Sequence, residues 1–426
     1  MNKKAFAISM LLGLSLFGGN SFAQQRCQDV FNVTEIQAQA FYDSLKAKDP
    51  STLLAKTEYD KDVLLTHLRN VANGRPILIF TDASFSQASG VVTMMKVFQE
   101  IEAKFGIKLR LVMPEDFKRQ LKVNYQDMLL SFPTKGEVEA IIKEQNPFAV
   151  HIMVEGTVGK KVRKVLLQKE IPFTSAYHTD FPKYVSSTVN IPILKDILKR
   201  LTYRMLKGFH KPSEGVMVPT QTMKEELVKN GFGDIELRNW SHGVDIVKFD
   251  PSFRSEHPFE GLKRPISLYV GRVAPEKNLE SFLAMKTPGT KVIIGDGPSR
   301  AELQEKYPDT VFLGRKPHEQ LPEFFASSDV FVFPSLTDTF GLVLLEAAAS
   351  GTPVLAFNVQ GPKDAISSPT AGVLVKHDAD FATSVRALEE GFNASLHLNR
   401  EGVRQYAEEH SWETSLLEFL YFLKPL

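Results

Sequence analysis

The clearest chemical signal in the chain is a pair of cations five residues apart. Arg272 and Lys277 follow the apolar segment 266–270, so both stand where a buried strand would end and a helix would begin. From there a planar guanidinium and a mobile ammonium can reach one pair of phosphate groups and stabilise the charge that grows on a departing diphosphate. An isolated basic turn is usually only solvated, so the pair needs support from its surroundings.

Two acids farther along the chain offer that support. Asp338 and Glu346 are separated by seven residues, and a helix begins at Gly341 between them. The backbone N–H groups of Gly341, Leu342 and Val343 would offer an anion site for phosphate. Glu346, inside the helix, would accept two hydrogen bonds from a ribose diol, and Asp338 in the loop would hold sugar hydroxyls. Two spaced acids alone are more often a solvated helix face.

The order of the motifs in the second half gives these residues a context. Three segments follow one another, at 271–278 (GRVAPEKN), 295–298 (GDGP) and 334–347 (PSLTDTFGLVLLEA). Together they closely resemble the donor domain of retaining glycosyltransferases of family 4 (group 1), which have the GT-B fold. Within that family they are most similar to the α-mannosyltransferases and the sulfoquinovosyl- or glycosyl-lipid synthases. The resemblance covers roughly residues 76–426.

The first half contains three further elements that resemble this family. Ser89 and Gly90 resemble an Asn-Gly element whose glycine lets the backbone approach the donor, and the segment 177–182 (YHTDFP) matches the histidine loop in which His178 faces the donor sugar. The segment 242–245 (HGVD) resembles an Arg-Gly-Val-Asp turn with His242 in place of arginine. Because a histidine is only partly charged at neutral pH, this replacement predicts weaker phosphate binding.

The resemblance implies a set of site residues on both sides of a cleft. Gly314 matches the segment whose backbone meets the nucleobase, although the base itself stays open. The implied catalytic residues are His178, Arg272, Lys277 and Asp338. The implied donor-binding residues are Gly90, Gly314, Phe340, Gly341, Leu342 and Glu346.

The alternation of short apolar segments with amphipathic ones predicts the elements that position these residues. It is typical of parallel α/β proteins, in which ligands bind beyond the carboxyl ends of the strands. Strands are expected at 77–80, 109–113, 149–154, 173–177 and 216–219, and again at 266–270, 291–294, 311–313, 330–333 and 354–357. We therefore predict two Rossmann-like doubly wound domains facing a cleft, with a helical N-terminal extension.

A linker rich in proline, charge and phenylalanine at about 248–265 separates the two halves. The predicted division is a signal peptide at 1–23, a helical extension at 24–75, an acceptor-side domain at 76–250, a donor domain at 251–410 and a C-terminal helix at 411–426 that packs back on the N-terminal domain.

Composition excludes several classes of protein. With 51 basic and 50 acidic residues the net charge is +1, which gives no chain-wide attraction to nucleic acid or to an anionic membrane, so any such attraction must be local. The single cysteine forms neither an intramolecular disulfide nor a thiolate metal site. Asp378 and Asp380 have the spacing of a metal-binding DxD motif, but they follow a late strand away from the donor motifs. We interpret them as a helix cap and expect no metal and no cofactor.

The segment 194–211 allows two interpretations. Its apolar residues Leu194, Ile197, Leu198, Leu201, Met205 and Phe209 share one helical face, with lysines and arginines mostly elsewhere. The favoured interpretation is a helix that packs this face on the N-terminal sheet. The other is a surface for anionic lipid, which suits a glycolipid acceptor and a peripheral membrane contact.

The N-terminus predicts export. Lys3 and Lys4 precede an apolar run at 5–17, and Ser21-Phe22-Ala23 places small residues at both positions that a signal peptidase reads. The chain is then periplasmic, secreted or lumenal, or it stays membrane-associated through an uncleaved N-terminal segment.

These observations lead to one leading function and one rival. The leading hypothesis is a retaining, metal-independent glycosyltransferase that moves a hexose of mannose or glucose type from a GDP- or UDP-sugar to the hydroxyl of a sugar or glycolipid acceptor. The rival is an exported, catalytically inactive GT-B binding module.

Overall fold

The computed structural model describes most of the chain beyond the N-terminal region. The described residues are 58–85, 90–123, 128–178, 181–182, 192–338 and 340–426. The predicted signal peptide 1–23, the extension as far as residue 57, and Ser89 lie outside them. The chain divides into two units between Asn70 and Val71. The helix α4 (Glu58–Ala72) supplies the described part of the first unit, and its helical character agrees with the predicted extension.

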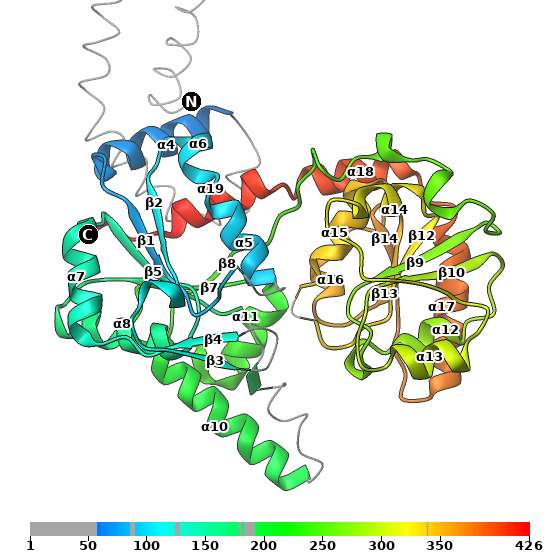
Figure 1. Ribbon diagram of the computed structural model, residues 1–426, viewed down its shortest axis with the longest axis horizontal. Helices are drawn as coiled ribbons and strands as arrows, with labels where there is room; N and C mark the ends of the chain where they lie inside the picture. Colours follow the sequence, from blue (N-terminus) through cyan, green and yellow to red (C-terminus); the bar gives the residue numbers. More distant parts are fainter. Residues whose placement is uncertain (1–57, 86–89, 124–127, 179–180, 183–191, 339) are drawn as a thin grey trace, which may run out of the picture. The chain divides into compact units, whose positions relative to one another are not determined.

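A six-stranded sheet forms the first domain of the second unit (Figure 1). All its neighbouring strands are parallel, in the order β2-β1-β5-β6-β7-β8. The strands are β1 (Ile77–Phe80), β2 (Leu109–Val112), β5 (Ala149–Ile152), β6 (Thr174–Ala176), β7 (Val216–Val218) and β8 (Leu237–Asn239). The helices are α5 (Gly90–Phe98), α6 (Ile101–Phe105), α7 (Lys135–Gln145), α8 (Thr157–Gln168), α10 (Pro192–His210) and α11 (Gln221–Leu227).

A second parallel sheet follows, in the order β11-β10-β9-β12-β13-β14. Its strands are β9 (Ile266–Val270), β10 (Thr290–Ile294), β11 (Val311–Gly314), β12 (Val330–Phe333), β13 (Val354–Phe357) and β14 (Gly372–Val375). Its helices are α12 (Leu279–Leu283), α13 (Arg300–Lys306), α14 (Leu321–Ser327), α15 (Leu342–Ala349), α16 (Pro362–Ala365) and α17 (Phe381–Ser395). The central strands β9, β12 and β13 are buried along their whole length, which explains their uninterrupted apolar sequences.

The two doubly wound sheets confirm the predicted fold class, and all ten predicted strands are present with ends shifted by at most two residues. The late strand before Asp378 is β14, and Asp380 caps α17 by accepting a hydrogen bond from the Thr383 amide at 2.8 Å, as predicted. Three strands lie outside the predicted set: β8, and the antiparallel hairpin of β3 (Gln120–Val123) and β4 (Met128–Ser131). The hairpin is hard to see because its apolar residues are not all buried: Leu121 is 55% exposed.

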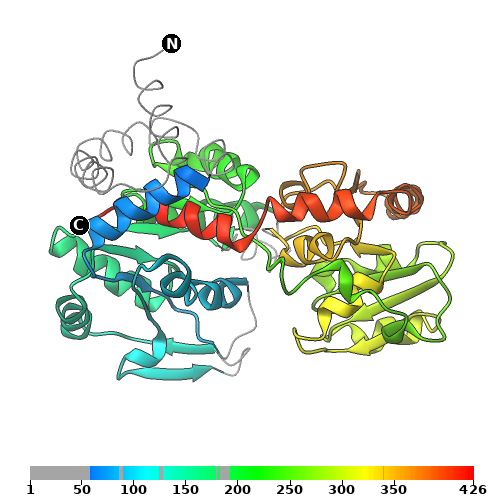
Figure 2. The ribbon, with the colours of Figure 1, turned by 90° about the horizontal axis from the view of Figure 1, so that it is seen from above.

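The C-terminal residues form two helices, α18 (Arg400–Glu408) and α19 (Trp412–Phe422), drawn in red in Figure 2. α19 contacts the first domain: the buried Phe419 ring lies 4.6 Å from Phe98 and 5.1 Å from Trp240. The Leu426 amide donates a hydrogen bond to the Phe148 carbonyl oxygen at 2.7 Å. Residues from the end of the chain thus complete the core of a domain that begins near its start.

The favoured interpretation of 194–211 is a helix that packs its apolar face on the N-terminal sheet. It is wrong for most of the apolar residues on that face. The buried face of α10 consists of Tyr203, Leu206, Phe209 and His210, whereas Leu194, Ile197, Leu201 and Met205 are exposed. Helical periodicity identifies an apolar face but not the neighbour that covers it. In the described part of the chain, no helix is both long enough and apolar enough to cross a membrane.

Candidate functional site

The second sheet reverses its strand order between β9 and β12, and this is the point where doubly wound sheets bind ligands. Arg272 and Lys277 follow β9, whereas Asp338 follows β12. The fold therefore brings together residues more than sixty positions apart in the sequence, because the first and fourth strands of this sheet are neighbours. Both predicted cations and the predicted loop acid lie at the exits of these two strands.

Lys277 and Asp338 form an ion pair, with Nζ 2.6 Å from Oδ1. The two side chains are 20% and 19% exposed, so water screens the pair only in part. The second carboxylate oxygen of Asp338, Oδ2, is buried and has no hydrogen-bond partner among the described residues. A buried acceptor without a partner is costly, so a ligand hydroxyl that reached Oδ2 would be stabilised.

Arg272 has a different partner. Its guanidinium lies 3.0 Å from Glu276, four residues later, and both side chains are more than two-fifths exposed. An exposed pair of this kind contributes little to stability, so an incoming phosphate can replace Glu276 at small cost. In the structure each cation is paired with its own carboxylate, and the contact of both cations with one phosphate pair stays a prediction.

Hydrogen bonds between the two strand exits fix their spacing. The Asn278 side-chain amide donates to the Pro334 carbonyl oxygen at 3.2 Å, and the Thr337 hydroxyl donates to the Glu276 carbonyl oxygen at 3.4 Å. The loop after β10 approaches from the other side. A Cβ atom on Gly295 would lie 1.8 Å from the Gly271 carbonyl oxygen, so only glycine fits there.

The start of α15 meets the first domain. Gly341 precedes the helix with φ +89°, a conformation that disfavours any other residue. The Leu344 amide donates to the Gly341 carbonyl oxygen at 2.9 Å, whereas the Leu342 and Val343 amides have no acceptor among the described residues. The preceding Phe340 is 4% exposed. Gly90 begins α5, and a Cβ atom on it would lie 3.7 Å from Leu342 Cδ1. Four of the predicted donor-binding residues are therefore found around this helix start.

Glu346 is held by a residue that sequence analysis missed. Its Oε1 lies 3.0 Å from His318 Nε2, and His318 Nδ1 lies 2.7 Å from Lys248 Nζ. Because an ammonium only donates, Nδ1 is the acceptor and Nε2 carries the proton that Glu346 accepts. Glu346 is 8% exposed, and none of the described residues binds its Oε2. One sequence signal could have revealed His318. It lies four residues after Gly314, the glycine that ends β11 with φ +68°, and therefore in the loop at a strand exit.

Uncharged histidines lie on the first-domain side. His178 follows β6, and both its ring nitrogens are buried without a hydrogen-bond partner in the described part of the chain. Its ring stacks on His242 at 5.9 Å, and the His242 ring meets the second-domain residue Phe340 at 5.2 Å. Burial lowers the pKa of His178 well below its usual range and lowers the pKa of His242 to about 4. The expectation of a partly charged His242 is therefore wrong, because burial keeps the ring neutral at neutral pH.

A further acid at the switch point of the first sheet, Asp82, was also missed. It follows β1 and accepts hydrogen bonds from the Val158 amide at 2.7 Å and the Gly159 amide at 3.0 Å, at the start of α8. Burial raises the pKa of this carboxyl, and the two amides oppose the shift. Because Asp82 already uses both oxygens to cap a helix, the geometry assigns it a structural role.

Comparison with protein families agrees with this arrangement. Residues 102–248 match the model described as Glycosyltransferase Family 4. Residues 253–409 match the model described as Glycosyl transferases group 1. The two matches fall on the first and second domains in turn.

Three curated relatives illustrate the similarity. A D-inositol 3-phosphate glycosyltransferase of Mycolicibacterium smegmatis is 30% identical over 378 residues, which cover 82% of each chain. A GDP-mannose-dependent alpha-mannosyltransferase of Mycobacterium tuberculosis is 32% identical over 251 residues, or 58% of this chain and 64% of the relative. Sulfoquinovosyl transferase SQD2 of Arabidopsis thaliana is 27% identical over 340 residues, or 74% and 66%. The chain thus spans just under two thirds of the length of the latter two relatives.

Solved structures share the fold. Sucrose-phosphate synthase from Thermosynechococcus elongatus has a TM-score of 0.64 at 19% identity, covering 80% of this chain and 97% of that one. WaaG, a glycosyltransferase involved in lipopolysaccharide biosynthesis, has a TM-score of 0.56 at 16% identity, covering 81% and 98%. At such low identity these likenesses speak for the fold alone. Together with the family matches and the relative that is similar along most of its length, they show that this chain belongs to the family 4, group 1 glycosyltransferases and has the GT-B fold.

Proposed function

We propose that this chain is a retaining glycosyltransferase that moves a hexose from a nucleoside diphosphate sugar to an acceptor hydroxyl without a bound metal ion. The observation that carries the proposal is the Lys277–Asp338 pair at 2.6 Å, placed at the switch point of the second sheet. A cation for the diphosphate and a carboxylate for the sugar are already in contact there. Either can exchange its present partner for the part of the donor that it suits better.

Donor binding would then proceed as an exchange of partners. The diphosphate would replace Glu276 at Arg272 and Asp338 at Lys277, and it would accept hydrogen bonds from the first amides of α15. Once released, Asp338 would accept hydrogen bonds from sugar hydroxyls, and Glu346, oriented by His318, would accept from the ribose.

The transfer would occur on one face of the sugar. The bond between C1 and the diphosphate oxygen breaks, the acceptor oxygen forms the new bond to C1 on the same face, and the acceptor proton passes to the departing diphosphate. Arg272, Lys277 and the α15 amides stabilise the charge that grows on the leaving group. This route needs no carboxylate nucleophile, and it retains the configuration at C1.

The names of relatives support a choice of substrates. The Mycobacterium tuberculosis relative is named as GDP-mannose-dependent, which supports a mannose-type sugar on GDP, with a glucose-type sugar on UDP as the second candidate. Another relative is named alpha-monoglucosyldiacylglycerol synthase, which supports a glycolipid acceptor alongside a sugar acceptor.

Thermal unfolding with GDP, UDP and ADP tests the donor site. At about 100 times its dissociation constant, a bound nucleotide adds about 2.7 kcal/mol to the free energy of unfolding. We expect a higher midpoint with one nucleotide and a smaller shift in Lys277→Ala. The matched control is Lys306→Ala, which removes a lysine paired with Glu280 at 2.5 Å in the same domain. No shift with any nucleotide, or equal shifts in both variants, would overturn the proposal.

Product analysis tests the mechanism. We expect an α-linked product from an α-linked donor, detected by the anomeric proton coupling, and the same rate with and without a chelator of divalent metal ions. An inverted product would contradict the same-face route. Loss of the rate with the chelator would contradict metal independence.

A second candidate is an exported GT-B module that binds without transferring. It is favoured by the predicted export and by the uncharged His242, which stands where the family's turn has arginine. Nucleotide binding without transfer to any sugar or glycolipid acceptor would support this module and contradict the enzyme.

We further propose export, from Lys3, Lys4 and the apolar run 5–17. Cell fractionation and N-terminal sequencing test it. A cytosolic chain that retains Met1 would contradict it.

A further inference from the structure

Helix α10 leaves a row of apolar side chains uncovered. Among its described side chains, the exposed apolar ones are Ile193 (75% exposed), Leu194 (41%), Ile197 (48%), Leu201 (57%) and Met205 (55%). Consecutive helical residues are about 100° apart around the axis, which places these five within one arc of about 120°. Contiguous apolar surface of this kind marks an interaction site more often than isolated exposed residues do.

The C-terminal end of α10 is fixed to the first domain. Arg163 donates hydrogen bonds to the Phe209 and Gly208 carbonyl oxygens, both at 2.7 Å. The buried His210 lies between Ser175 and Glu155, at 2.9 Å from each. Figure 1 shows the helix extending from this anchor away from the sheet. The uncovered row therefore lies on a helix whose C-terminal end is anchored to the first domain.

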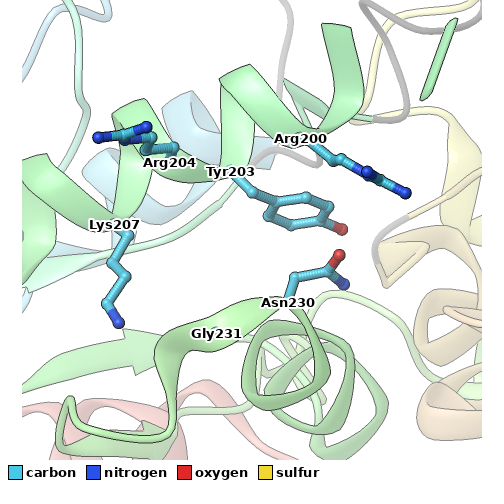
Figure 3. Close-up of a pocket in the computed structure, with 6 residues that line it drawn as sticks. All are labelled: Arg200, Tyr203, Arg204, Lys207, Asn230 and Gly231. Carbon is cyan, nitrogen blue, oxygen red and sulfur yellow. The ribbon is translucent and has the colours of Figure 1, made fainter. Parts of the chain in front are cut away.

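Cations lie beside the apolar row and within it. By the same helical geometry, Arg200 and Lys207 lie between the exposed row and the buried face, whereas Arg204 lies within the arc of the row itself. These three cations line a pocket of about 370 Å³ together with Tyr203, Asn230 and Gly231. Figure 3 shows the first four side chains on α10 and the last two residues on the facing segment, with the Tyr203 hydroxyl directed toward Asn230.

The charge of this pocket is mostly uncompensated. Neither Arg200 nor Arg204 forms an ion pair with a described residue, whereas Lys207 pairs with Asp234 at 2.7 Å. The nearby carboxylate of Glu226 is neutralised by Lys199 at 3.3 Å and accepts hydrogen bonds from Tyr203 and Asn230. The Tyr203 hydroxyl and the Asn230 amide are thus already committed to Glu226, and the donors left for a phosphate group are the guanidinium groups of Arg200 and Arg204.

We propose that α10 binds the surface of an anionic phospholipid membrane, with the pocket taking a lipid phosphate and the apolar row entering the acyl region beside it. A helix with an apolar arc bordered by cations lies in the membrane interface in this way. The charge complementarity favours a lipid surface over a second copy of the chain, whose α10 would present the same positive charge. The proposal goes beyond the proposed function, because it needs neither donor nor acceptor.

Vesicle sedimentation of the full chain tests the electrostatic half. We compare vesicles of phosphatidylcholine alone with vesicles that also contain phosphatidylglycerol. Arg200→Gln/Arg204→Gln should lower binding to the anionic vesicles about 30-fold, since each cation near such a surface contributes about fivefold. The matched control is Lys160→Gln/Lys164→Gln, which removes two exposed cations with the same spacing on α8. Equal binding by the two variants would overturn the proposal.

A second pair of variants tests insertion. Leu201→Ser/Met205→Ser should lower binding at least about tenfold because two apolar side chains no longer enter the acyl region. The control Val247→Ser/Phe381→Ser removes apolar side chains that are 83% and 48% exposed elsewhere. An unchanged affinity of the α10 variant would contradict insertion.

Two further measurements separate other occupants. If inorganic phosphate alone raised the unfolding midpoint of the wild type but not of Arg200→Gln/Arg204→Gln, and anionic vesicles did not bind, the pocket would serve a soluble anion and the proposal would fail. If sedimentation without vesicles showed a dimer that Leu201→Ser/Met205→Ser dissociates, the row would be a contact between copies. None of these tests measures sugar transfer, so their results can still be interpreted if the proposed enzyme activity is absent.

Discussion

Both domains are doubly wound, although their strand orders differ, and they use the point after their first strand differently. In the first sheet Asp82 follows β1, and both its carboxylate oxygens accept hydrogen bonds from the amides that begin α8. In the second sheet the cations after β9 are paired with carboxylates that a ligand can replace, and Asp338 retains a buried oxygen without a partner among the described residues. Topology thus marks two candidate points, and unused hydrogen-bonding capacity distinguishes a binding site from a helix cap.

The two domains also differ in the charge of their polar side chains near the strand exits. The first domain buries His151, His178 and His242 in uncharged form around Trp240, whereas the second keeps ion pairs at its strand exits. The first arrangement requires the C-terminal helix, because Phe419 packs on both His151 and Trp240.

Replacing Phe419 by alanine should lower the free energy of unfolding by about 3–5 kcal/mol, because a fully buried ring leaves a cavity in the first domain. Chemical denaturation followed by tryptophan fluorescence measures it, since Trp240 lies 5.1 Å from this ring. The control is Phe381→Ala, on α17 of the second domain, where the ring is 48% exposed. Equal losses in the two variants would show that α19 is not part of the first-domain core.

Replacing Lys277 by alanine should lower kcat about 100- to 1000-fold, because the departing diphosphate loses one stabilising cation. The variant also leaves the largely buried Asp338 carboxylate without its cation, so its unfolding midpoint should fall, and the rates are measured well below that midpoint. Initial rates of sugar transfer at saturating donor measure the effect, with Lys306→Ala as the paired-lysine control. An unchanged kcat would show that Lys277, at the switch point of the second sheet, takes no part in the transfer.

Acid should destabilise the first domain through its buried histidines. The pKa of His242 falls from 6.5 to about 4 on folding, so between these values the unfolded chain binds a proton that the folded chain does not. Stability from this group is therefore complete above about pH 6.5 and is lost toward about pH 4, with a loss of about 2 kcal/mol by pH 5. His242→Gln should reduce this slope in tryptophan-detected unfolding, and the exposed His397→Gln should not. A steeper slope in His242→Gln would contradict the sign.

Replacing His318 by alanine should have the smallest effect. Glu346 loses the partner that orients it, so nucleotide affinity should fall about tenfold, the amount expected for one weakened charge-assisted hydrogen bond, while kcat stays near wild type. Calorimetric titration with the nucleotide identified by thermal unfolding measures it. His318→Gln, which keeps a donor, should recover most of the affinity. A kcat loss as large as that of Lys277→Ala would place His318 in the chemistry itself.

Much of the fold and part of the site were accessible from the sequence. The strands β9, β12 and β13 are apolar throughout because both faces are buried, so their positions and the residues after them could be predicted. Local signals likewise identified the glycine start of α15 and the Asp380 cap of α17. The contact between His318 and Glu346 was not accessible, since the two residues are 28 positions apart and only the pairing of strands brings them together.

The sequence by itself determined the alternation of strands and helices, the order of the motifs and therefore the family, because these depend on residues close in the chain. Only the tertiary structure decided which charges meet, which histidines lose water and which face of α10 stays uncovered. Each of these depends on a neighbour from another element: Asp338 for Lys277, Phe340 for His242, and the sheet beneath α10 for Phe209. Burial and pairing are properties of such contacts, and the spacing of residues along one segment does not specify them.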